Sequence, residues 1–390
     1  MISVHEALSQ LFALVSPLET EPIDLREGTG RVLATAAHAT RAQPPFDASA
    51  MDGYALAQGD VAEGAKLTVI GEAPAGHGFQ GRVGPGEAVR IFTGAPLPTG
   101  TDHVEIQENV ARDGDAITLL SPQPAGANVR KAGTDFEVGE AVAAPRILGA
   151  ADIALLAAMN VPKITVTRRP EVALISTGDE LVMPGEDPRL DQIIASNALG
   201  LEALLSAHGA LPRVLPIAKD TAESLNSAFR FARGADLVVT IGGASVGDHD
   251  LVRPVAAEHG LRPSFYKVAI RPGKPLTAGR LGTTPMLGLP GNPVSALVCG
   301  HVFLLPMVRV MLGLPARPAE RMSAPLAHDV PPNGPREHYM RAVVDGSGLR
   351  VFNRQDSSLL GVFAEANALA IRPASDPARA AGETLSYLPL

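Results

Sequence analysis

The organisation of the chain is decided by residues 172–180, VALISTGDE, and residues 237–247, LVVTIGGASVG. Each stretch is a short apolar run of the length typical of a buried strand, followed directly by glycine and hydroxyl residues. Between them lie a helical pattern over residues 198–208 that Gly209 ends, and another apolar strand near residues 214–217. This alternation predicts an α/β/α domain with a parallel sheet, whose ligands bind at the carboxyl ends of the strands.

Outside this region the pattern changes. Residues 42–128 contain short alternating strands between Gly and Pro clusters, which predict a small β domain inserted into an elongated α/β domain of residues 1–41 and 129–169. Residues 170–312 form the predicted sheet domain, and residues 313–390 return to short strands, typical of a C-terminal β domain. The predicted fold class is therefore a multidomain α/β protein.

Composition limits the classes of partner. The 390 residues carry a formal net charge of -8 at pH 7, which disfavours binding to nucleic acid. The single cysteine, Cys299, lies in an apolar run, so an intramolecular disulfide and a multi-cysteine metal site are excluded. We find no signal peptide and no apolar run approaching the roughly 20 residues that cross a bilayer, and therefore expect a cytoplasmic protein without a membrane contact.

Four loops at the predicted sheet edge carry groups suited to a phosphate-bearing ligand. The first loop (residues 176–180) supplies hydroxyls and carboxylates, and the third (residues 271–275) supplies cations. The second (residues 242–250) and the fourth (residues 289–293) supply backbone amides before a helix. Each loop alone could equally be a packing turn, but four at one edge favour a ligand site. The candidate substrate-binding residues are Ser176, Thr177, Gly178, Gly242, Gly243, Ser245, Gly247, Lys274, Pro290, Gly291, Asn292 and Pro293.

Acidic side chains beside a phosphate pocket need a counter-charge, because two like charges 4 Å apart repel by about 4 kcal/mol at an effective dielectric constant near 20. Magnesium supplies one, since Mg²⁺ is held by one or two carboxylates together with substrate phosphates and water. The predicted ligands are Asp250 with Glu180 or Asp179. The alternative, that these carboxylates cap helices, is strongest for Asp248.

The inserted region adds two polar segments, residues 44–55 and residues 92–96, which contain Asp52 and Thr93. Their Asp-Gly and Thr-Gly pairs are also typical of hairpin turns. Because they are far in sequence from the sheet loops, they would meet those loops across a domain or subunit cleft.

With these segments the chain resembles the molybdopterin molybdenumtransferase family, whose animal counterpart is the C-terminal part of gephyrin. The resemblance runs from the N-terminal helix to about Arg372, and five signatures match in type and order. They are residues 49–55 (SAMDGYA), Thr93–Gly94, residues 176–181 (STGDEL), residues 242–247 (GGASVG) and residues 289–293 (LPGNP). The chain departs from the family pattern at Thr134, Ile241, Ala244 and residues 195–197, and keeps every carboxylate on which the prediction depends.

The resemblance implies four domains in an elongated subunit, a homodimer, and an active cleft between the sheet domain of one subunit and the inserted region of the other. The implied reaction inserts molybdate into adenylylated molybdopterin, with Mg²⁺-dependent release of AMP. The amides of Gly242 and Gly243 would hold the pyrophosphate, Lys274 would offset its charge, and Pro290 and Pro293 would shape the adjoining loop. The implied catalytic residues are Asp52, Thr93, Asp135, Glu180, Asp236 and Asp250, with Glu180 and Asp250 as metal ligands.

Two other functions stay open at this point. An adenylyltransferase of the preceding step would need little beyond the sheet domain, and that enzyme is also a candidate partner of this chain. A non-catalytic scaffold like gephyrin would not need the acidic loop residues. Molybdate and tungstate are two tetrahedral oxyanions of nearly equal size, so the loops give no preference between them.

Overall fold

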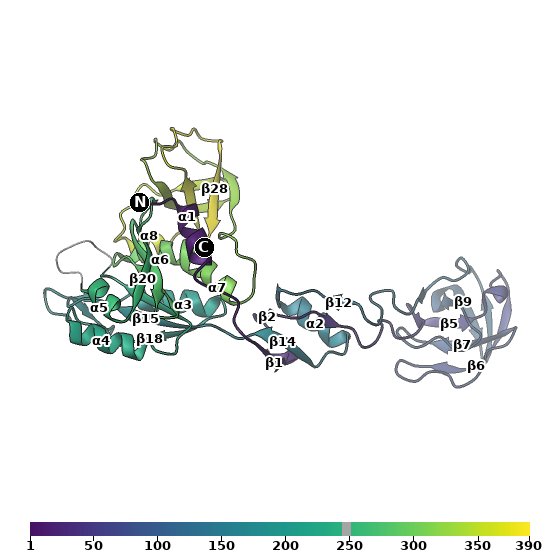
Figure 1. Ribbon diagram of the computed structural model, residues 1–390. Coiled ribbons are helices and arrows are strands. Elements are labelled where there is room, and N and C mark those ends of the chain that lie inside the picture. The colour runs from purple at the N-terminus through teal and green to yellow at the C-terminus, as the bar shows by residue number, and fades with distance from the viewer. Residues whose placement is uncertain (244–250) are drawn as a thin grey trace.

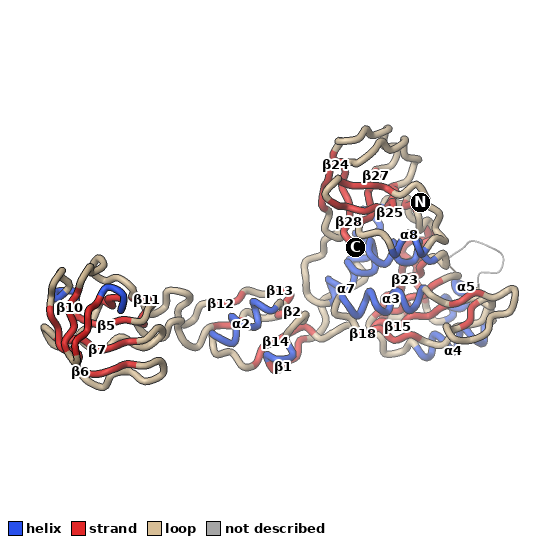
Figure 2. Tube along the Cα trace, turned by 180° about the vertical axis from the view of Figure 1, so that it is seen from behind, coloured by secondary structure: helices blue, strands red, loops and turns tan. Residues whose placement is uncertain are grey.

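The computed structural model describes residues 1–243 and 251–390. Figure 1 shows an elongated molecule in which a body, made of the sheet domain and the C-terminal β strands, carries a long arm. The arm comprises residues 20–167 and ends in the inserted β strands, far from the body (Figure 2). Two stretches of chain, residues 14–19 and residues 168–170, join the arm to the body, and we call them the neck.

The body is built on a six-stranded sheet in the order β18-β15-β19-β23-β22-β20. The first four strands are parallel, whereas β22 runs antiparallel to both of its neighbours. The multidomain α/β fold is confirmed, but its sheet is mixed rather than wholly parallel. Only Gly282 and Thr283 separate β22 from β23, too few residues for the crossover that parallel strands need. The strands are β15 Glu171–Ser176, β18 Leu211–Val214, β19 Leu237–Ile241, β20 Leu261–Lys267, β22 Pro275–Leu281 and β23 Thr284–Leu289, with the short pair β16 Leu181–Val182 and β17 Ile193–Ile194 beside them.

Side chains of the central strands alternate between two apolar layers, as the period of two along a strand requires. In β15, Val172 and Leu174 face one layer, and Ala173 and Ile175 face the other. The first layer is covered by α1 (Val4–Phe12), α3 (Asn197–Ala207), α6 (Pro293–Cys299) and α7 (Leu305–Met311), and the second by α4 (Ala222–Phe231) and α5 (Val252–Glu258). Ser3 and Glu6 form a capping box at the start of α1, which packs on the body although the sequence grouped it with the arm.

Residues Pro293–Met311 form one helical run, in which five residues of π-helix separate α6 from α7. Contrary to the sequence-based expectation, this run is long and apolar enough to cross a membrane, with a mean hydropathy of 1.8. However, 83% of it is buried inside the protein, and the core helix of a soluble protein passes the same test of length and composition.

The arm has two parts (Figure 1). Next to the neck, the sheet β1-β14-β2-β13 packs with α2, and the pair β3 and β12 extends it. Beyond them lie the six-stranded sheet β8-β5-β7-β6-β10-β9 and the pair β4 and β11. The bounds are β1 Thr20–Asp24, β2 Val32–Leu33, β3 Ala37–His38, β4 Ala48–Ser49, β5 Gly53–Leu56, β6 Lys66–Ala73, β7 Glu87–Ile91, β8 His103–Ile106, β9 Val110–Asp113, β10 Ala116–Leu119, β11 Val129–Arg130, β12 Ala141–Val142, β13 Arg146–Ile147, α2 Ala150–Ala158 and β14 Lys163–Thr167.

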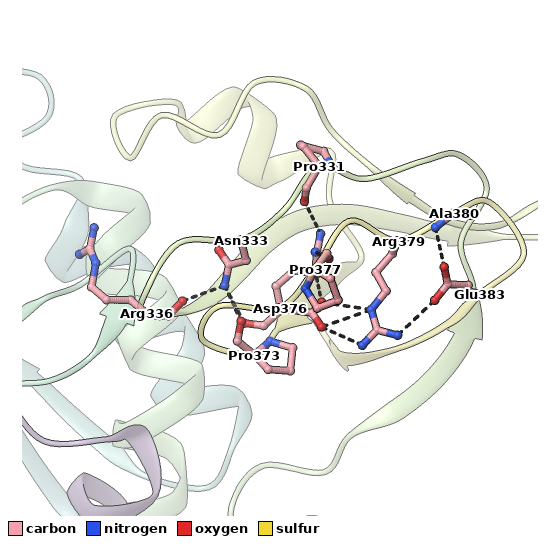
Figure 3. A network of polar contacts seen from close by, with 10 residues as sticks. Pro331, Asn333, Arg336, Pro373, Asp376, Pro377, Arg379, Ala380 and Glu383 are labelled. Atoms are coloured by element: carbon pink, nitrogen blue, oxygen red, sulfur yellow. Dashed lines mark hydrogen bonds and ion pairs between the residues drawn. The ribbon is translucent and has the colours of Figure 1, made fainter.

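The C-terminal sheet is tied to the sheet domain, because β21 (Ile270–Arg271) pairs with β25. The other elements are β24 Met322–Pro325, β25 Glu337–Asp345, β26 Gly348–Val351, α8 Leu360–Ala364, β27 Ala368–Arg372 and β28 Thr384–Pro389. A polar network holds the start of β25 in place (Figure 3). In it Asn333 donates to the carbonyl of Arg336 at 2.8 Å, and the buried Arg372 binds Asp376 at 2.6 Å.

Candidate functional site

The loops after β15, β19 and β23 meet at the carboxyl edge of the sheet and surround a cavity of ≈ 800 Å³, which we call the larger cavity. Ten of the predicted substrate-binding or catalytic residues line it, namely Ser176, Thr177, Gly178, Glu180, Gly242, Gly243, Pro290, Gly291, Asn292 and Pro293. Asn197, at the start of α3, donates to the carbonyl of Gly291 at 2.7 Å and fixes the fourth loop. The structure thus brings the first, second and fourth of the predicted loops together at one edge of the sheet.

Two glycines allow the second loop to pack tightly. Gly242 and Gly243 have φ of 95° and 59°, where side chains are disfavoured. A Cβ atom on Gly243 would lie 2.2 Å from Val252, and one on Gly242 would lie 2.8 Å from the carbonyl of Thr177. The predicted role of Gly242 needs correction, however. Its N–H donates to the carbonyl of Leu289 at 3.1 Å, so this amide is already engaged and does not point at a phosphate.

Carboxylates reach the larger cavity from two loops. Glu180 is exposed and lines the cavity. The backbone N–H of Asp220 donates to the Asp179 carboxylate at 3.2 Å, and Asp220 lines the same cavity. Sequence reasoning missed Asp220, although its position between β18 and α4, at the sheet edge that carries the other loops, was a usable signal.

The structure does not bring Asp236 to this edge. Asp236 precedes β19, so it lies at the amino end of the strand, and its amide donates to the carbonyl of Glu171 at 2.9 Å. Its carboxylate binds Arg168 through two bonds of 2.6 and 2.7 Å. The carboxyl edge, where the ligand loops gather, is the opposite end of the strand.

Asp250, Ser245 and Gly247, together with Asp248, lie outside the described residues. The predicted pairing of Glu180 with Asp250 is therefore not visible. Within residues 1–243 and 251–390, no group of three His, Cys, Asp or Glu side chains is arranged to hold a metal ion.

A second cavity of ≈ 530 Å³, the smaller cavity, lies between the sheet domain and the C-terminal strands. It shares Pro275, Pro290 and Asn292 with the larger cavity. Lys274 lines this cavity and not the larger one, so among the predicted substrate-binding residues that the structure describes it shares a cavity with Pro290 and Asn292 alone. Its remaining lining includes the cations Arg271 and Arg336, the hydroxyls of Ser295 and Ser357, and one acidic residue, Asp356, so cations outnumber carboxylates there.

Arg341, in β25, lies directly behind the smaller cavity. Its backbone exchanges hydrogen bonds of 3.0 and 2.9 Å with the side chain of Gln355, and its Nη2 donates to the carbonyl of Asp356 at 2.9 Å. The side chain is 0% exposed, and its Nε and Nη1 have no hydrogen-bond partner among the described residues. Burial lowers the pKa of Arg341 to about 10, which leaves it charged at neutral pH. Buried, unpaired N–H groups on a cation are an arrangement that an anion would satisfy.

His338 lies beside Arg271 in the pairing of β25 with β21. It is 4% exposed, and burial, with the nearby charges of Arg271, Arg341, Arg336 and Arg372, lowers its pKa to about 3. The imidazole is therefore neutral, and the positive charge at the smaller cavity belongs to lysine and arginine. The sequence analysis missed Arg336 and Arg341. Two arginines in the otherwise strand-like stretch of residues 336–344 were the signal.

Asp52 and Thr93 form a pair at the far end of the arm. The backbone N–H and the hydroxyl of Thr93 donate to the same oxygen of Asp52, at 2.8 and 2.7 Å. These bonds lower the pKa of Asp52, so the carboxylate is ionised at neutral pH. The guanidinium of Arg90 lies 5.1 Å from the ring centre of Tyr54 and 5.0 Å from that of Phe92. These contacts link the two segments that carry Asp52 and Thr93.

Within one chain the arm's far end is remote from the larger cavity (Figures 1 and 2). The pair formed by Asp52 and Thr93 is therefore not assembled with Glu180 in a single subunit. Asp135 lies between β11 and β12, where its amide donates to the carbonyl of Gln43 at 2.9 Å, and its side chain is exposed. The predicted catalytic residues thus form separate groups.

Family comparisons cover nearly the whole chain. Residues 2–160 match the MoeA N-terminal region (domains I and II), residues 173–310 match a probable molybdopterin binding domain, and residues 323–390 match the MoeA C-terminal region (domain IV).

Relatives of known sequence and structure agree with these matches. A molybdopterin molybdenumtransferase of Nostoc is 37% identical over 100% of this chain and 94% of its own length. That of Haemophilus influenzae is 36% identical over 80% of this chain and 78% of its own. A solved structure of a molybdopterin biosynthesis MoeA protein from Pyrococcus horikoshii, 30% identical, superposes with a TM-score of 0.85 over 100% of this chain and 99% of that one.

Proposed function

Because this chain belongs to the molybdopterin molybdenumtransferase family and is a transferase, we propose that its two adjoining cavities hold the two substrates of molybdenum insertion. In this proposal the larger cavity binds adenylylated molybdopterin and the smaller cavity binds molybdate. The dithiolene sulfurs of the pterin receive the metal, and cleavage of the pyrophosphate releases AMP. The observation that carries the proposal is the shared wall of Pro275, Pro290 and Asn292, which places an oxyanion beside a phosphate-bearing ligand.

The larger cavity suits the nucleotide-bearing pterin in size and in chemistry. A volume of ≈ 800 Å³ is within the usual range for cofactor pockets. Hydroxyls of Ser176 and Thr177 and the fourth loop can bind phosphate and ring edges, and Glu180 can orient the water that attacks the pyrophosphate.

The smaller cavity suits a dianionic oxyanion. Arg271, Lys274 and Arg336 supply fixed positive charge, and the side chains of Ser295 and Ser357 supply hydroxyl donors. The unpaired N–H groups of Arg341 add a buried cation behind the lining. A stand-alone adenylyltransferase would have no use for a cationic cavity between the sheet domain and the C-terminal strands, so this cavity favours molybdenum insertion over the preceding step.

A magnesium ion fits the carboxylates of the larger cavity, because Glu180 and Asp220 come from two loops that face the same space. Glu180, with Asp220 or Asp250, would hold it. When bound, Mg²⁺ would neutralise charge on the pyrophosphate. The protein's own part is to keep these carboxylates at the cavity.

We further propose that the enzyme acts as a homodimer in the cytoplasm. The support is the separation of Asp52 and Thr93 from the larger cavity within one chain, since a second subunit can supply the pair. Asp135, which is exposed near the base of the inserted strands, would line the same intersubunit cleft. The adenylyltransferase of the preceding step would deliver the substrate and is a candidate partner.

The test is direct. Purified protein is incubated with adenylylated molybdopterin, molybdate and Mg²⁺, and AMP is measured together with metal-bound cofactor. We expect AMP release that depends on all three additions. AMP release without metal insertion would contradict the proposal, and no AMP release at all would contradict it and favour the scaffold function.

A further inference from the structure

The two neck stretches leave the arm side by side. β1 and β14 are paired antiparallel, with Thr20 opposite Thr167, so residues 14–19 and residues 168–170 emerge from the same end of one sheet (Figure 1). The angle between arm and body therefore depends on the contacts that hold these two stretches.

One side chain binds both the other neck stretch and the body. Arg168 donates through Nε to the carboxylate of Glu19 at 2.8 Å, and its backbone N–H donates to the carbonyl of Glu19 at 3.0 Å. Its Nη1 and Nη2 donate to the two carboxylate oxygens of Asp236, at 2.6 and 2.7 Å. A bidentate salt bridge between a guanidinium and a carboxylate fixes the relative orientation of the two groups as well as their distance.

Asp236 is a firm anchor for this bond. It directly precedes β19, which lies in the middle of the body's sheet, and its side chain is 14% exposed. Its carboxylate also accepts the N–H of Glu171 at 2.8 Å. Burial by itself raises the pKa of Asp236, but the bonds from Arg168 and Glu171 outweigh burial and hold the pKa below its usual value.

Apart from this ion pair, apolar packing and single backbone hydrogen bonds join the arm and the neck to the body, including one of 2.8 Å from the N–H of Leu211 to the carbonyl of Pro170. Val32 of the arm packs into the apolar layer of the body, and the N–H of Leu18 donates to the carbonyl of Met311 at 2.8 Å. Apolar packing is non-directional, so it permits small rotations of the arm relative to the body that a bidentate salt bridge resists.

We propose that Arg168 is a positioning residue: held between Glu19 and Asp236, it sets the angle of the arm and thereby where Asp52 and Thr93 meet the partner subunit's larger cavity. The inference rests on the proposed function, because it assumes that the second subunit supplies this pair. A small angular error at the neck becomes a large displacement at the far end of the arm. Substrate binds to loops of the body, so loss of the clamp should lower kcat and leave KM for adenylylated molybdopterin near its wild-type value.

The test measures orientation and turnover in the same protein. Cysteines are introduced at Ala157 on α2 and at Ala207 on α3, both exposed, while the native Cys299 is buried and unreactive. Spin labels report the distance from arm to body, and labelled chains are diluted with unlabelled chains so that only distances within one subunit are read. In Arg168→Ala we expect a broadened or shifted distance distribution and a kcat lower by roughly 10- to 100-fold, the scale of a misplaced catalytic group.

Four further variants sharpen the result. Asp236→Asn should reproduce both changes, and the double variant should be no worse than the more affected single one, because the two residues act as a unit. Arg168→Lys keeps the positive charge but cannot make the bidentate hydrogen bonds of a guanidinium. It should therefore fold like the wild type and still broaden the distance distribution. Arg146→Ala is the matched control, since it breaks an ion pair of 2.8 Å to Asp152 that lies wholly within the arm.

Two outcomes would overturn the inference. One is a lower kcat in Arg168→Ala with the wild-type distance distribution, and the other is a broadened distribution with the wild-type kcat. Failure of the proposed function itself would be recognised separately, since the wild-type protein would then release no AMP.

Discussion

The larger and smaller cavities share a wall but are constructed differently. The larger cavity is lined by backbone loops in which Gly242 and Gly243 permit close packing, with hydroxyls and carboxylates exposed to the ligand. The smaller cavity is lined by cationic side chains, and behind it lies a buried arginine with unpaired N–H groups. A large ligand with a leaving group requires a shaped, preorganised surface, whereas a small dianion requires charge. Substitutions in the larger cavity should therefore change turnover, and those around the smaller cavity should change the molybdate concentration that the enzyme needs.

The largest expected effect is at Glu180. Glu180→Gln keeps the size and hydrogen-bonding capacity of the side chain but removes its charge. We expect adenylylated molybdopterin to bind with nearly wild-type affinity and the rate of AMP release to fall roughly 100-fold or more, the scale of losing one electrostatic catalytic contact. Single-turnover AMP release and equilibrium binding of the pterin measure the two quantities separately.

Asp179→Asn provides the neighbouring control, because Asp179 accepts the amide of Asp220 and does not line the larger cavity. A loss at Glu180 that came with equally weakened pterin binding would show a role in binding and not in the chemical step. The requirement for Mg²⁺ should also rise in Glu180→Gln, if this carboxylate is one of the metal's ligands.

At the smaller cavity we expect a different signature from Arg341. Arg341→Met preserves much of the side chain's volume and removes a buried cation with two unpaired N–H groups. The molybdate concentration for half-maximal activity should rise roughly 10-fold, or about 1.4 kcal/mol. Arg341 is 0% exposed and does not line the cavity, so it attracts the dianion through its charge and not through a hydrogen bond. The Tm should stay the same or rise, because replacing an unsatisfied buried charge with an apolar group is often stabilising.

Arg379→Met is the matched control for this variant. Arg379 binds Asp376 and Glu383 in the same β domain but does not line the smaller cavity (Figure 3). An unchanged molybdate dependence in Arg341→Met, or the same shift in Arg379→Met, would remove the oxyanion site from the proposal.

A smaller effect is expected at the arm. Asp52→Ala removes the acceptor of both Thr93 bonds from a partly exposed turn. Turnover should fall, while the Tm should change by no more than about 2 °C, as for a surface residue away from the core. Mixing this variant with Glu180→Gln is the informative measurement. If each cleft is shared by two subunits, a mixed dimer has one cleft with both substitutions and one complete cleft with neither. Absence of recovered activity in the mixture would contradict the intersubunit cleft.

The sequence predicted the loops of the larger cavity because their signal is local. An apolar strand followed by glycines places those glycines at the carboxyl end of the strand, and the residues after β15, β19 and β23 lie there. Asp236 was assigned to the same edge although it precedes its strand, and a residue before a parallel strand lies at the amino edge. Lys274 reaches the carboxyl edge for another reason, since it precedes the antiparallel β22.

The smaller cavity could not be predicted in this way. Its lining cations are Arg271 and Lys274 of the sheet domain and Arg336, which directly precedes β25 and which the chain reaches some 60 residues later. Only the pairing of β21 with β25 brings Arg271 beside His338, and no local pattern specifies a contact between two such distant stretches. The sequence contained two separate signals of this site, the cationic loop with Lys274 and the two arginines Arg336 and Arg341, but nothing in it joined the two.

The smallest expected effect is on the pH dependence of stability. It distinguishes a histidine whose pKa is lowered by burial together with the charges at the smaller cavity from a histidine that is buried away from that cavity. The pKa of His338 is lowered to about 3 by burial and by four neighbouring arginines, whereas the pKa of His301, in the buried helical run, is lowered to about 4 by burial and by His208. An unfolded histidine has a pKa of about 6.5, so between that value and the folded pKa the unfolded state binds a proton that the native state does not. Stability should therefore fall as the pH drops below about 6.5, and His338→Gln and His301→Gln should each make the Tm less dependent on pH.

Molybdate should distinguish the two variants. An oxyanion in the smaller cavity offsets the arginine charges and lets the pKa of His338 rise, so saturating molybdate should flatten the pH dependence of the Tm in His301→Gln, which retains His338. In His338→Gln the remaining dependence comes from His301, which no ligand of the smaller cavity reaches, and molybdate should leave its slope unchanged. Equal flattening in both variants would mean that the anion acts elsewhere, and the contrast between the two cavities would then lose its electrostatic basis.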